Sequence, residues 1–270
     1  MPLAVCATPI GNLDDVTLRV LAELRAADVI LCEDTRRTRI LLERQGIRAR
    51  MLSYHRHNEA ARTAELLPRL LAGERMALAS DAGLPGVSDP GLRLIDAALD
   101  AGLEVTVLPG PSAVETALVA SGLATGRYRF VGYLPRGRAG LEALWSDLAR
   151  SPDVIVAFES PRRLPGTLES LAGALPERRV AVCRELTKRF EEVVRGSAVE
   201  LADRFRDPPK GEITIVVGAG GAAGTGGAAE EEAVAVVAEL VASGLPRRGA
   251  AELVSRLTGL PRNRLYRPSA

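Results

Sequence analysis

Residues 75–80, Arg-Met-Ala-Leu-Ala-Ser, followed by residues 81–91, Asp-Ala-Gly-Leu-Pro-Gly-Val-Ser-Asp-Pro-Gly, decide the fold of this 270-residue chain. A short, nearly continuous apolar run is typical of a strand buried on both faces of a parallel sheet. The Gly- and Pro-rich loop leads into a helical pattern. We expect Asp89 to cap that helix, Pro90 to lie in its first turn and Gly102 to end it. The stretch therefore predicts one strand–loop–helix unit of a parallel sheet.

The same unit recurs through residues 1–122, which we expect to form an N-terminal α/β domain. A helix is predicted over residues 58–72, with Asn58 as its N-cap and Gly73 just past its end. The last helix of this part begins with Ser-Ala-Val-Glu at 112–115, a capping-box pattern. Strands that alternate with helices predict a mostly parallel, right-handed α/β sheet. The predicted strands are Leu3–Thr8, Val29–Cys32, Arg50–Ser53, Arg75–Ser80 and Glu104–Leu108.

A second α/β domain is predicted over residues 123–218. Its candidate strands are centred near residues 131, 156, 182, 193 and 215. The strands near 182 and 193 are too close for a crossover helix, so this sheet is expected to be mixed. Residues 219–229 have the Gly/Ala-rich composition of a linker, and residues 230–270 are expected to form a small, basic helical extension with breaks at Gly244 and Gly259.

The composition narrows the class of protein. An apolar fraction of 47% provides a core, and a net charge of +1 gives no overall preference for nucleic acid. No apolar run is long enough to span a membrane and no signal peptide is visible, so we expect a cytoplasmic protein. The three cysteines each lie in an apolar run, which predicts small core residues in a reducing compartment.

The loops after the first five strands hold nearly all the unusual residues of this half. Ligands bind beyond the carboxyl ends of the strands in an open parallel sheet. The chain has neither a G-x-G-x-x-G after the first strand nor a P-loop, so dinucleotide and P-loop functions lose their main support. These residues alone predict a polar small ligand, zwitterionic or anionic, at the strand ends. The loops are residues 8–15, 33–37, 54–59, 81–91 and 109–112.

Both histidines lie in Ser-Tyr-His-Arg-His-Asn-Glu, residues 53–59. His55 and His57 beside Glu59 fit a metal site, a catalytic base or ordinary loop chemistry. No further histidine and no nearby cysteine completes a soft tetrahedral site, so we expect no metal. A non-enzymatic metal- or RNA-binding module built on these histidines remains an alternative. Only two of the 35 basic residues, Lys188 and Lys210, are lysines, which can lose a proton where arginine cannot.

A series of motifs in a fixed order closely resembles one family, the 16S ribosomal RNA cytidine 2′-O-methyltransferases of the tetrapyrrole methylase superfamily. The resemblance covers about residues 3–218, and the tail resembles the helical extension of that family. Leu84 departs from the pattern, because the family usually has threonine there. The motifs are TPIGNL (8–13), CEDTR (32–36), HRHNE (55–59), SDAGLP-x-x-SDPG (80–91), LPGPSA (108–113), FES-x-x-R (158–163), RELTK (184–188) and KGE (210–212).

The resemblance implies that S-adenosylmethionine binds in a cleft between the two domains. It also implies a small-subunit ribosomal RNA substrate and a homodimer. A tetrapyrrole-precursor methylase of the same fold is the alternative enzyme, disfavoured by the basic tail and the HRHNE motif. The implied cofactor-binding residues are Pro9, Gly11, Asp81, Leu84, Pro85, Ser112, Ala113, Phe158, Cys183, Arg184, Glu212 and Ile213.

A ribose hydroxyl is a weak nucleophile, so a base or a nearby cation assists its attack on a methyl group. Lys188, His57 and Glu33 are the candidate catalytic residues, with His55, Asp34 and Lys210 as further candidates for the base. The aromatic and basic segment 127–138 fits either RNA stacking or a core strand. The candidate RNA-binding residues are His55, Arg36, Arg37, Lys210, Arg247, Arg248, Arg262 and Arg264.

Overall fold

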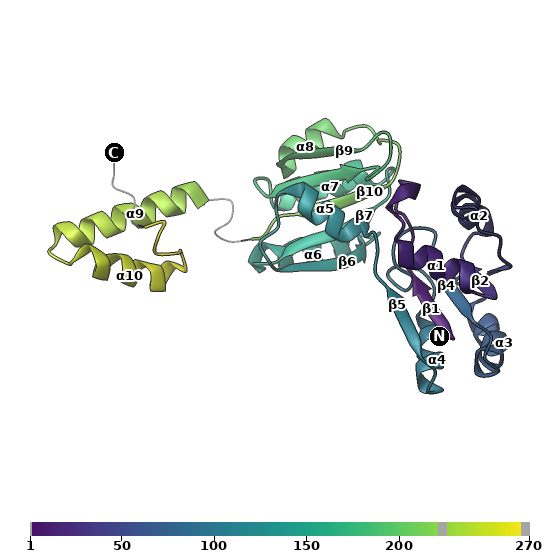
Figure 1. Ribbon diagram of the computed structural model, residues 1–270. Helices are drawn as coiled ribbons and strands as arrows, with labels where there is room; N and C mark the ends of the chain where they lie inside the picture. Colours follow the sequence, from purple (N-terminus) through teal and green to yellow (C-terminus); the bar gives the residue numbers. More distant parts are fainter. Residues whose placement is uncertain (1, 221–225, 266–270) are drawn as a thin grey trace.

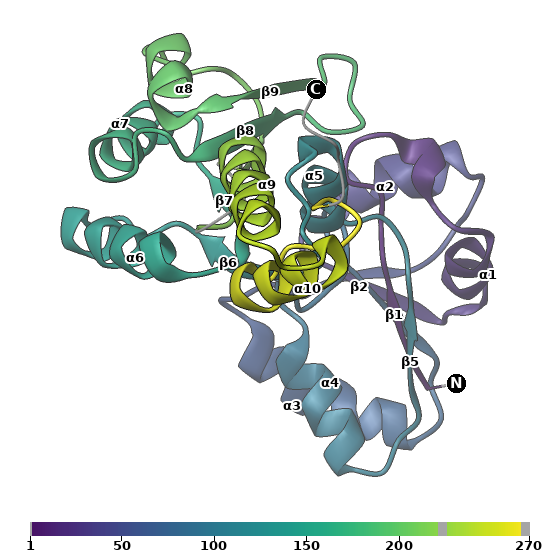
Figure 2. The same ribbon diagram turned by 90° about the vertical axis from the view of Figure 1, so that its left-hand side faces the viewer.

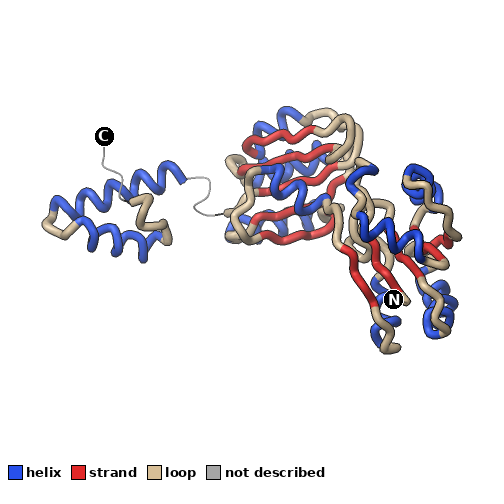
Figure 3. The backbone as a smooth tube through the Cα atoms, in the orientation of Figure 1, coloured by secondary structure: helices blue, strands red, loops and turns tan. Residues whose placement is uncertain are grey.

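The computed structural model describes residues 2–220 and 226–265. These residues form two five-stranded sheets followed by a pair of helices (Figures 1 and 3). The first sheet is parallel throughout, in the order β3-β2-β4-β1-β5, which confirms the predicted fold class. All five predicted strands are present, each shortened by no more than two residues. They are β1 (Leu3–Cys6), β2 (Val29–Cys32), β3 (Met51–Ser53), β4 (Met76–Ala79) and β5 (Val105–Leu108).

Helices cover both faces of the first sheet (Figure 2). One face packs against α1 and α2 through residues such as Leu24 and Leu42. The other packs against α3 and α4 through Leu66 and Leu94. Burial on both faces explains the nearly continuous apolar strands. The helices are η1 (Leu13–Asp15, 3-10), α1 (Leu18–Ala26), α2 (Thr35–Arg44), α3 (Glu59–Leu71) and α4 (Leu92–Asp100).

The predicted start of α4 is wrong. Asp89 and Pro90 belong to the preceding loop, and Gly91 is the N-cap with φ 141°. A side chain at Gly91 would place its Cβ 2.9 Å from Leu78 Cδ2. Glu59 of α3 accepts the hydrogen bond that the Gly91 N–H donates, at 3.0 Å. A carboxylate from another helix therefore does what the prediction assigned to Asp89.

Two other predicted N-cap residues are at the predicted positions, but their side chains do not make the expected capping hydrogen bonds. Ser112 is the N-cap of α5 (Ala113–Ser121), but its hydroxyl donates to the Glu115 carboxylate, so the capping box does not form. Asn58 is the N-cap of α3, yet its side-chain oxygen accepts from the His55 N–H at 2.8 Å. Another local partner replaces the expected capping bond in each case, the Glu115 side chain for Ser112 and the His55 N–H for Asn58, because short polar side chains compete for nearby groups.

The second sheet has the order β6-β7-β10-β8-β9, with a parallel β6/β7 pair and antiparallel pairs elsewhere. This confirms the expected mixed sheet. Helices α6, α7 and α8 cover one face and α5 covers the other (Figure 2). The elements are β6 (Tyr128–Tyr133), α6 (Arg138–Arg150), β7 (Val154–Glu159), α7 (Leu164–Ala174), β8 (Arg179–Arg184), β9 (Glu192–Ser197), α8 (Ala198–Arg204) and β10 (Ile213–Val217).

Helix α5 joins the two sheets. It follows the last strand of the first sheet, yet it buries Ala117 and Leu118 in the same cluster as Ala181 and Val216 of the second. Ile10, from the loop after β1, lies in that cluster too. The loops at the strand ends of the first sheet therefore face the second sheet across a shared apolar junction.

The tail folds around a small core of its own, to which Val237, Val254 and Leu265 contribute. It contains α9 (Gly226–Ala242) and α10 (Arg247–Thr258), with both predicted breaks between or after the helices. Helix α9 begins inside the predicted linker, whose residues 221–225 lie outside the described ranges, as do residues 266–270. None of the helices that the structure describes has the length and apolar character needed to cross a bilayer. The three cysteines are buried and free, as predicted.

Candidate active site

A cavity of about 750 Å³ lies between the strand ends of the first sheet and the second sheet. Its walls come from the loops after β2, β4 and β5, the start of α5, and strands β6, β7, β8 and β10. The cavity is thus built where the sequence places the ligand. Of the predicted cofactor-binding residues, those that line it are Asp81, Leu84, Ser112, Ala113, Phe158, Cys183, Glu212 and Ile213.

One end of the cavity is acidic. Asp81 lies there with Glu33 and Asp89. The Asp81 carboxylate accepts a hydrogen bond from the Asp34 N–H at 3.0 Å, and the Arg37 guanidinium lies 3.6 Å from its other oxygen. These contacts fix the carboxylate in place, so it is preorganised to hold a cationic group.

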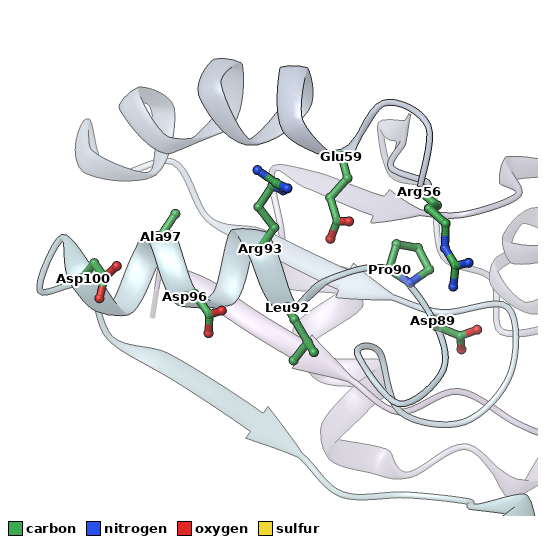
Figure 4. Close-up of a pocket in the computed structure, with 9 residues that line it drawn as sticks. All are labelled: Arg56, Glu59, Asp89, Pro90, Leu92, Arg93, Asp96, Ala97 and Asp100. Atoms are coloured by element: carbon green, nitrogen blue, oxygen red, sulfur yellow. The ribbon is translucent and has the colours of Figure 1, made fainter. Parts of the chain in front are cut away.

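Asp89 lies close to the other two carboxylates of this acidic end. Burial, with added repulsion from Glu33 and Asp81, raises its pKa to about 6, and Arg56 opposes the shift. Figure 4 shows Arg56 reaching from the loop after β3 toward Asp89, at one end of a depression between α3 and α4. A bound cation would offset the repulsion and favour the ionised form of Asp89.

Part of the cavity wall is aromatic. Phe130 packs edge to face against Phe158 with ring centroids 5.0 Å apart, and Tyr133 does the same at 5.7 Å. Leu84 and Ile213 add aliphatic surface to the lining. A wall of this kind suits a flat ring system. Phe130 and Tyr133 belong to the segment for which the sequence left RNA stacking and core packing open, and both line the cavity.

The four remaining predicted cofactor contacts lie outside the cavity lining. Pro9 and Pro85 are buried, and Arg184 pairs with Glu192 at 3.0 Å. Gly11 faces the segment after β8: a Cβ there would lie 2.5 Å from Lys188 Cγ and 2.8 Å from the Leu186 oxygen. This glycine lets the first loop approach the second sheet closely, which is a packing role.

Lys188 is held by two carboxylates. Its ammonium lies 3.0 Å from Glu185 Oε1 and 2.8 Å from Glu212 Oε2. Partial burial acts to lower the pKa of Lys188, but the hydrogen bonds to Glu212 and Glu185 outweigh it, so the pKa is raised. A lysine that stays protonated is suited to electrostatic stabilisation and is poorly suited to act as a base.

The other two candidate catalytic residues differ in position. Glu33 lines the acidic end of the cavity. His57 is exposed on the loop after β3, with its ring 6.0 Å from that of His55. The Nδ1 atom of His55 is buried and has no hydrogen-bond partner among the described residues. No cluster of three or more His, Cys, Asp or Glu side chains in the described ranges is arranged to hold a metal ion.

The predicted RNA-binding arginines are spread over the surface. Arg37 lines the cavity, whereas Arg36 is exposed and pairs with Asp34 at 2.7 Å. Lys210 is exposed on the loop before β10. The tail contributes four more exposed side chains, in the first turn of α10 and in the turn after it, which are Arg247, Arg248, Arg262 and Arg264.

Both parts of the chain match known protein families. Residues 2–202 match the family of Tetrapyrrole (Corrin/Porphyrin) Methylases, and residues 227–267 match the RsmI C-terminal HTH domain. The chain is 44% identical to Ribosomal RNA small subunit methyltransferase I of Mesorhizobium japonicum over 268 residues, which are 98% of this chain and 90% of that protein. A relative of the same name from Thermotoga maritima is 43% identical over 216 residues, 80% of this chain and 97% of the relative.

A solved structure shows the same fold. Uroporphyrin-III C-methyltransferase from Thermus thermophilus, in complex with S-adenosylhomocysteine, matches with a TM-score of 0.55 and 20% sequence identity. The match covers 79% of this chain and 96% of that one. At this identity the likeness concerns the fold alone.

Proposed function

Because this chain belongs to the tetrapyrrole methylases, and within them to the small-subunit ribosomal RNA methyltransferase I proteins, we propose that it methylates the 2′-oxygen of a cytidine ribose in 16S ribosomal RNA. The methyl donor is S-adenosylmethionine. The observation that carries the proposal is the cavity between the two sheets, acidic at one end and aromatic along one wall. A ribosomal substrate implies a cytoplasmic enzyme.

The residues present fit this cofactor. Asp81, with Asp89 beside it, can hold the cationic part of the methionine moiety. The aromatic wall around Phe158 can cover the adenine ring. The first turn of α5, beginning at Ala113, offers backbone N–H groups to the carboxylate. The cofactor supplies an activated methyl group, and the protein supplies alignment, from which most of the acceleration can come.

We propose Glu33 as the group that orients the ribose hydroxyl and receives its proton. It lines the cavity, whereas Lys188 stays charged between two carboxylates and His57 lies on an exposed loop. Lys188 then acts through its positive charge and by holding Glu212 at the cavity wall. His55 and His57 remain candidates for contact with RNA next to the reacting ribose.

The small ribosomal subunit is the proposed partner, and a homodimer is the proposed oligomeric state. The exposed arginines of α10 and of the turn after it support RNA binding, since they offer positive charge to phosphate groups at the surface. The Thermotoga relative is shorter than this chain. We therefore expect the tail to strengthen binding to the subunit without being indispensable for methyl transfer.

Methyl transfer from labelled cofactor to small subunits, free 16S RNA and tetrapyrrole precursors tests the proposal, followed by mapping of the modified nucleoside. Label in a 2′-O-methylcytidine of the RNA is the expected result, and transfer to a tetrapyrrole alone overturns it. Asp81→Asn tests the cofactor site by calorimetry: we expect roughly tenfold weaker binding or more, because a charge-assisted contact is lost. Asp100→Asn, on the exposed end of α4, is the matched control.

A further inference from the structure

The segment between β8 and β9, residues 185–191, forms a stiff turn. Glu185 and Thr187 have φ values of 51° and 63°, a region that non-glycine residues rarely occupy. The Thr187 N–H donates to Glu191 Oε2 at 2.6 Å, and the Glu191 N–H donates to the Lys188 oxygen at 3.1 Å. These cross-turn bonds hold the backbone in a conformation that it would otherwise leave.

The 185–191 turn is tied to both halves of the active site. Glu185 Oε1 accepts the Glu212 N–H at 2.8 Å, and Leu186 lines the cavity beside Glu212. On the other side, the Asn12 N–H donates to Thr187 Oγ1 at 3.0 Å. Figure 1 shows this connection at the end of the second sheet that faces the first. The turn is therefore a fixed part of the cavity rim.

The tip of this turn presents an aromatic ring and a guanidinium together. Phe190 is 66% exposed, and the Arg189 guanidinium lies over its ring, 5.6 Å from the centroid. Among the described residues, no carboxylate lies within ion-pair distance of Arg189. Isolated exposed apolar residues are ordinary. An exposed phenylalanine that is stacked with a cation on a rigid turn is a preorganised binding surface.

A groove adjoins this tip on the side of the first sheet. It has a volume of about 440 Å³ and includes Asn12, Arg44 and Arg189 in its lining, together with Lys188. Arg44 pairs with Asp14 at 2.9 Å, so Arg189 supplies the unbalanced positive charge. A groove of this charge, beside an exposed ring, matches single-stranded RNA, whose phosphates follow cationic grooves while its bases stack on aromatic rings.

Resting on the RNA substrate proposed above, we propose that Arg189 and Phe190 form a platform on which a base next to the target nucleotide stacks, with its phosphate in the adjoining groove. The platform positions the RNA strand at the rim while the target ribose enters the cavity. A second copy of this chain is the competing occupant of the exposed ring. The location at the cavity rim and the unpaired charge of Arg189 favour RNA.

The test compares Phe190→Ala with Phe190→Trp, using Leu99→Ala as the control, since Leu99 is 55% exposed on the distant α4. We expect Phe190→Ala to raise the KM for small subunits and to weaken RNA binding roughly 5- to 150-fold, which is the range for loss of one stacked base. Phe190→Trp is expected to restore wild-type binding within about twofold, because it keeps a stacking face. Cofactor affinity, measured by calorimetry, is expected to stay unchanged in all three variants.

Two outcomes overturn the platform. One is a Phe190→Ala enzyme that binds and methylates RNA as the wild type does. The other is a change in sedimentation of Phe190→Ala that shows the ring to be buried between two copies. Direct RNA binding separates this proposal from the function itself. If the wild type transfers no methyl group to RNA but loses RNA affinity on Phe190→Ala, the platform stands and the proposed reaction fails.

Discussion

Replacing Gly211 with alanine tests how the cavity rim is held. Gly211 has φ +99°, and a Cβ there would lie 2.4 Å from Glu185 Cγ and 2.6 Å from Glu185 Oε1. The left-handed conformation costs an alanine about 1–2 kcal/mol. The displaced Glu185 carboxylate also loses its bonds to the Glu212 N–H and to Lys188, worth about 1.5–3 kcal/mol as charge-assisted contacts. We therefore expect a loss of about 2.5–5 kcal/mol in the free energy of unfolding.

Substitutions at two other glycines separate the cost of backbone strain from the cost of losing the Glu185 contacts. Gly73 has φ +91° with nothing within 4 Å of an added Cβ, so Gly73→Ala measures backbone strain alone, about 1–2 kcal/mol. Gly166 lies in α7 with open space around it, so Gly166→Ala is expected to stabilise by about 0.5–1 kcal/mol. Urea unfolding followed by circular dichroism reports on both sheets, and the fluorescence of Trp145 reports on the second sheet, because this single tryptophan is buried in its core.

The pH dependence gives a further check on Gly211→Ala. The Glu212 N–H, and then Lys188, lower the pKa of Glu185 below its usual value of 4.5. A depressed carboxyl pKa adds stability above the unfolded value, and this stability is lost as the pH falls below 4.5. The difference between wild type and Gly211→Ala should therefore shrink on acidification. The role given to Glu185 would be refuted if Gly211→Ala and Gly73→Ala lose equal free energy of unfolding. It would also be refuted if the difference between wild type and Gly211→Ala does not change with pH.

Two further changes test the cavity wall and its acidic end. Arg163→Met leaves the fully buried Glu159 carboxylate without the guanidinium that lies 3.2 Å away, and should cost about 3 kcal/mol in urea unfolding, whereas Arg162→Met, at an exposed position, should cost almost nothing. Asp89, with its pKa raised to about 6, adds stability that is lost as the pH rises from about 4 to 6. If the bound cation lowers that pKa by one unit, cofactor binding should strengthen by about tenfold as the pH rises from about 5 to 6. Asp89→Asn should flatten both pH profiles, which calorimetry and urea unfolding at pH 5 and 8 would show, and unchanged profiles would exclude Asp89.

The strand segments of the first sheet were predictable because they carry a strong local signal. A strand such as Met76–Ala79 is apolar throughout, and the loop after it is rich in glycine and proline. The helix α2, Thr35–Arg44, was not predicted, since most of its residues are polar or charged and only three side chains are buried, Thr38, Leu41 and Leu42. Its small apolar face indicates a helix only when the sheet against which it packs is known.

The helix starts show a different limit. Asp89-Pro90 and Ser112–Glu115 have the local pattern of caps, but Gly91 is bonded by Glu59 from another helix and Ser112 is bonded to a side chain. Propensity ranks the local options and cannot include a partner 32 residues away.

Part of the candidate site depended on the resemblance and part on the fold. The loops that line the cavity were predicted from the rule that ligands bind at strand ends. The family motifs then identified the individual residues within those loops. The aromatic wall did not follow, because Phe130 and Tyr133 lie on a strand of the second sheet whose position relative to those loops is a tertiary fact. A bulge between these two residues breaks the alternation that would assign each to one face.

The arrangement of charge reconciles a cationic cofactor with a polyanionic substrate. Most of the acidic groups that line the cavity have a cationic side chain close by, and the pairs are Asp81 with Arg37, Glu212 with Lys188, Glu159 with Arg163, and Asp89 with Arg56. Unpaired carboxylates at the rim would repel phosphate groups within a Debye length of about 8 Å at physiological salt. A paired carboxylate attracts a cation strongly only at contact distance, because its partner cancels its charge farther away. The net charge at the rim is then the unbalanced positive charge of Arg189. A reversal of that one charge, Arg189→Glu, should therefore weaken RNA binding more at low salt than at high salt, with cofactor affinity unchanged in calorimetry, and an equal effect at both salts would refute this account of the rim.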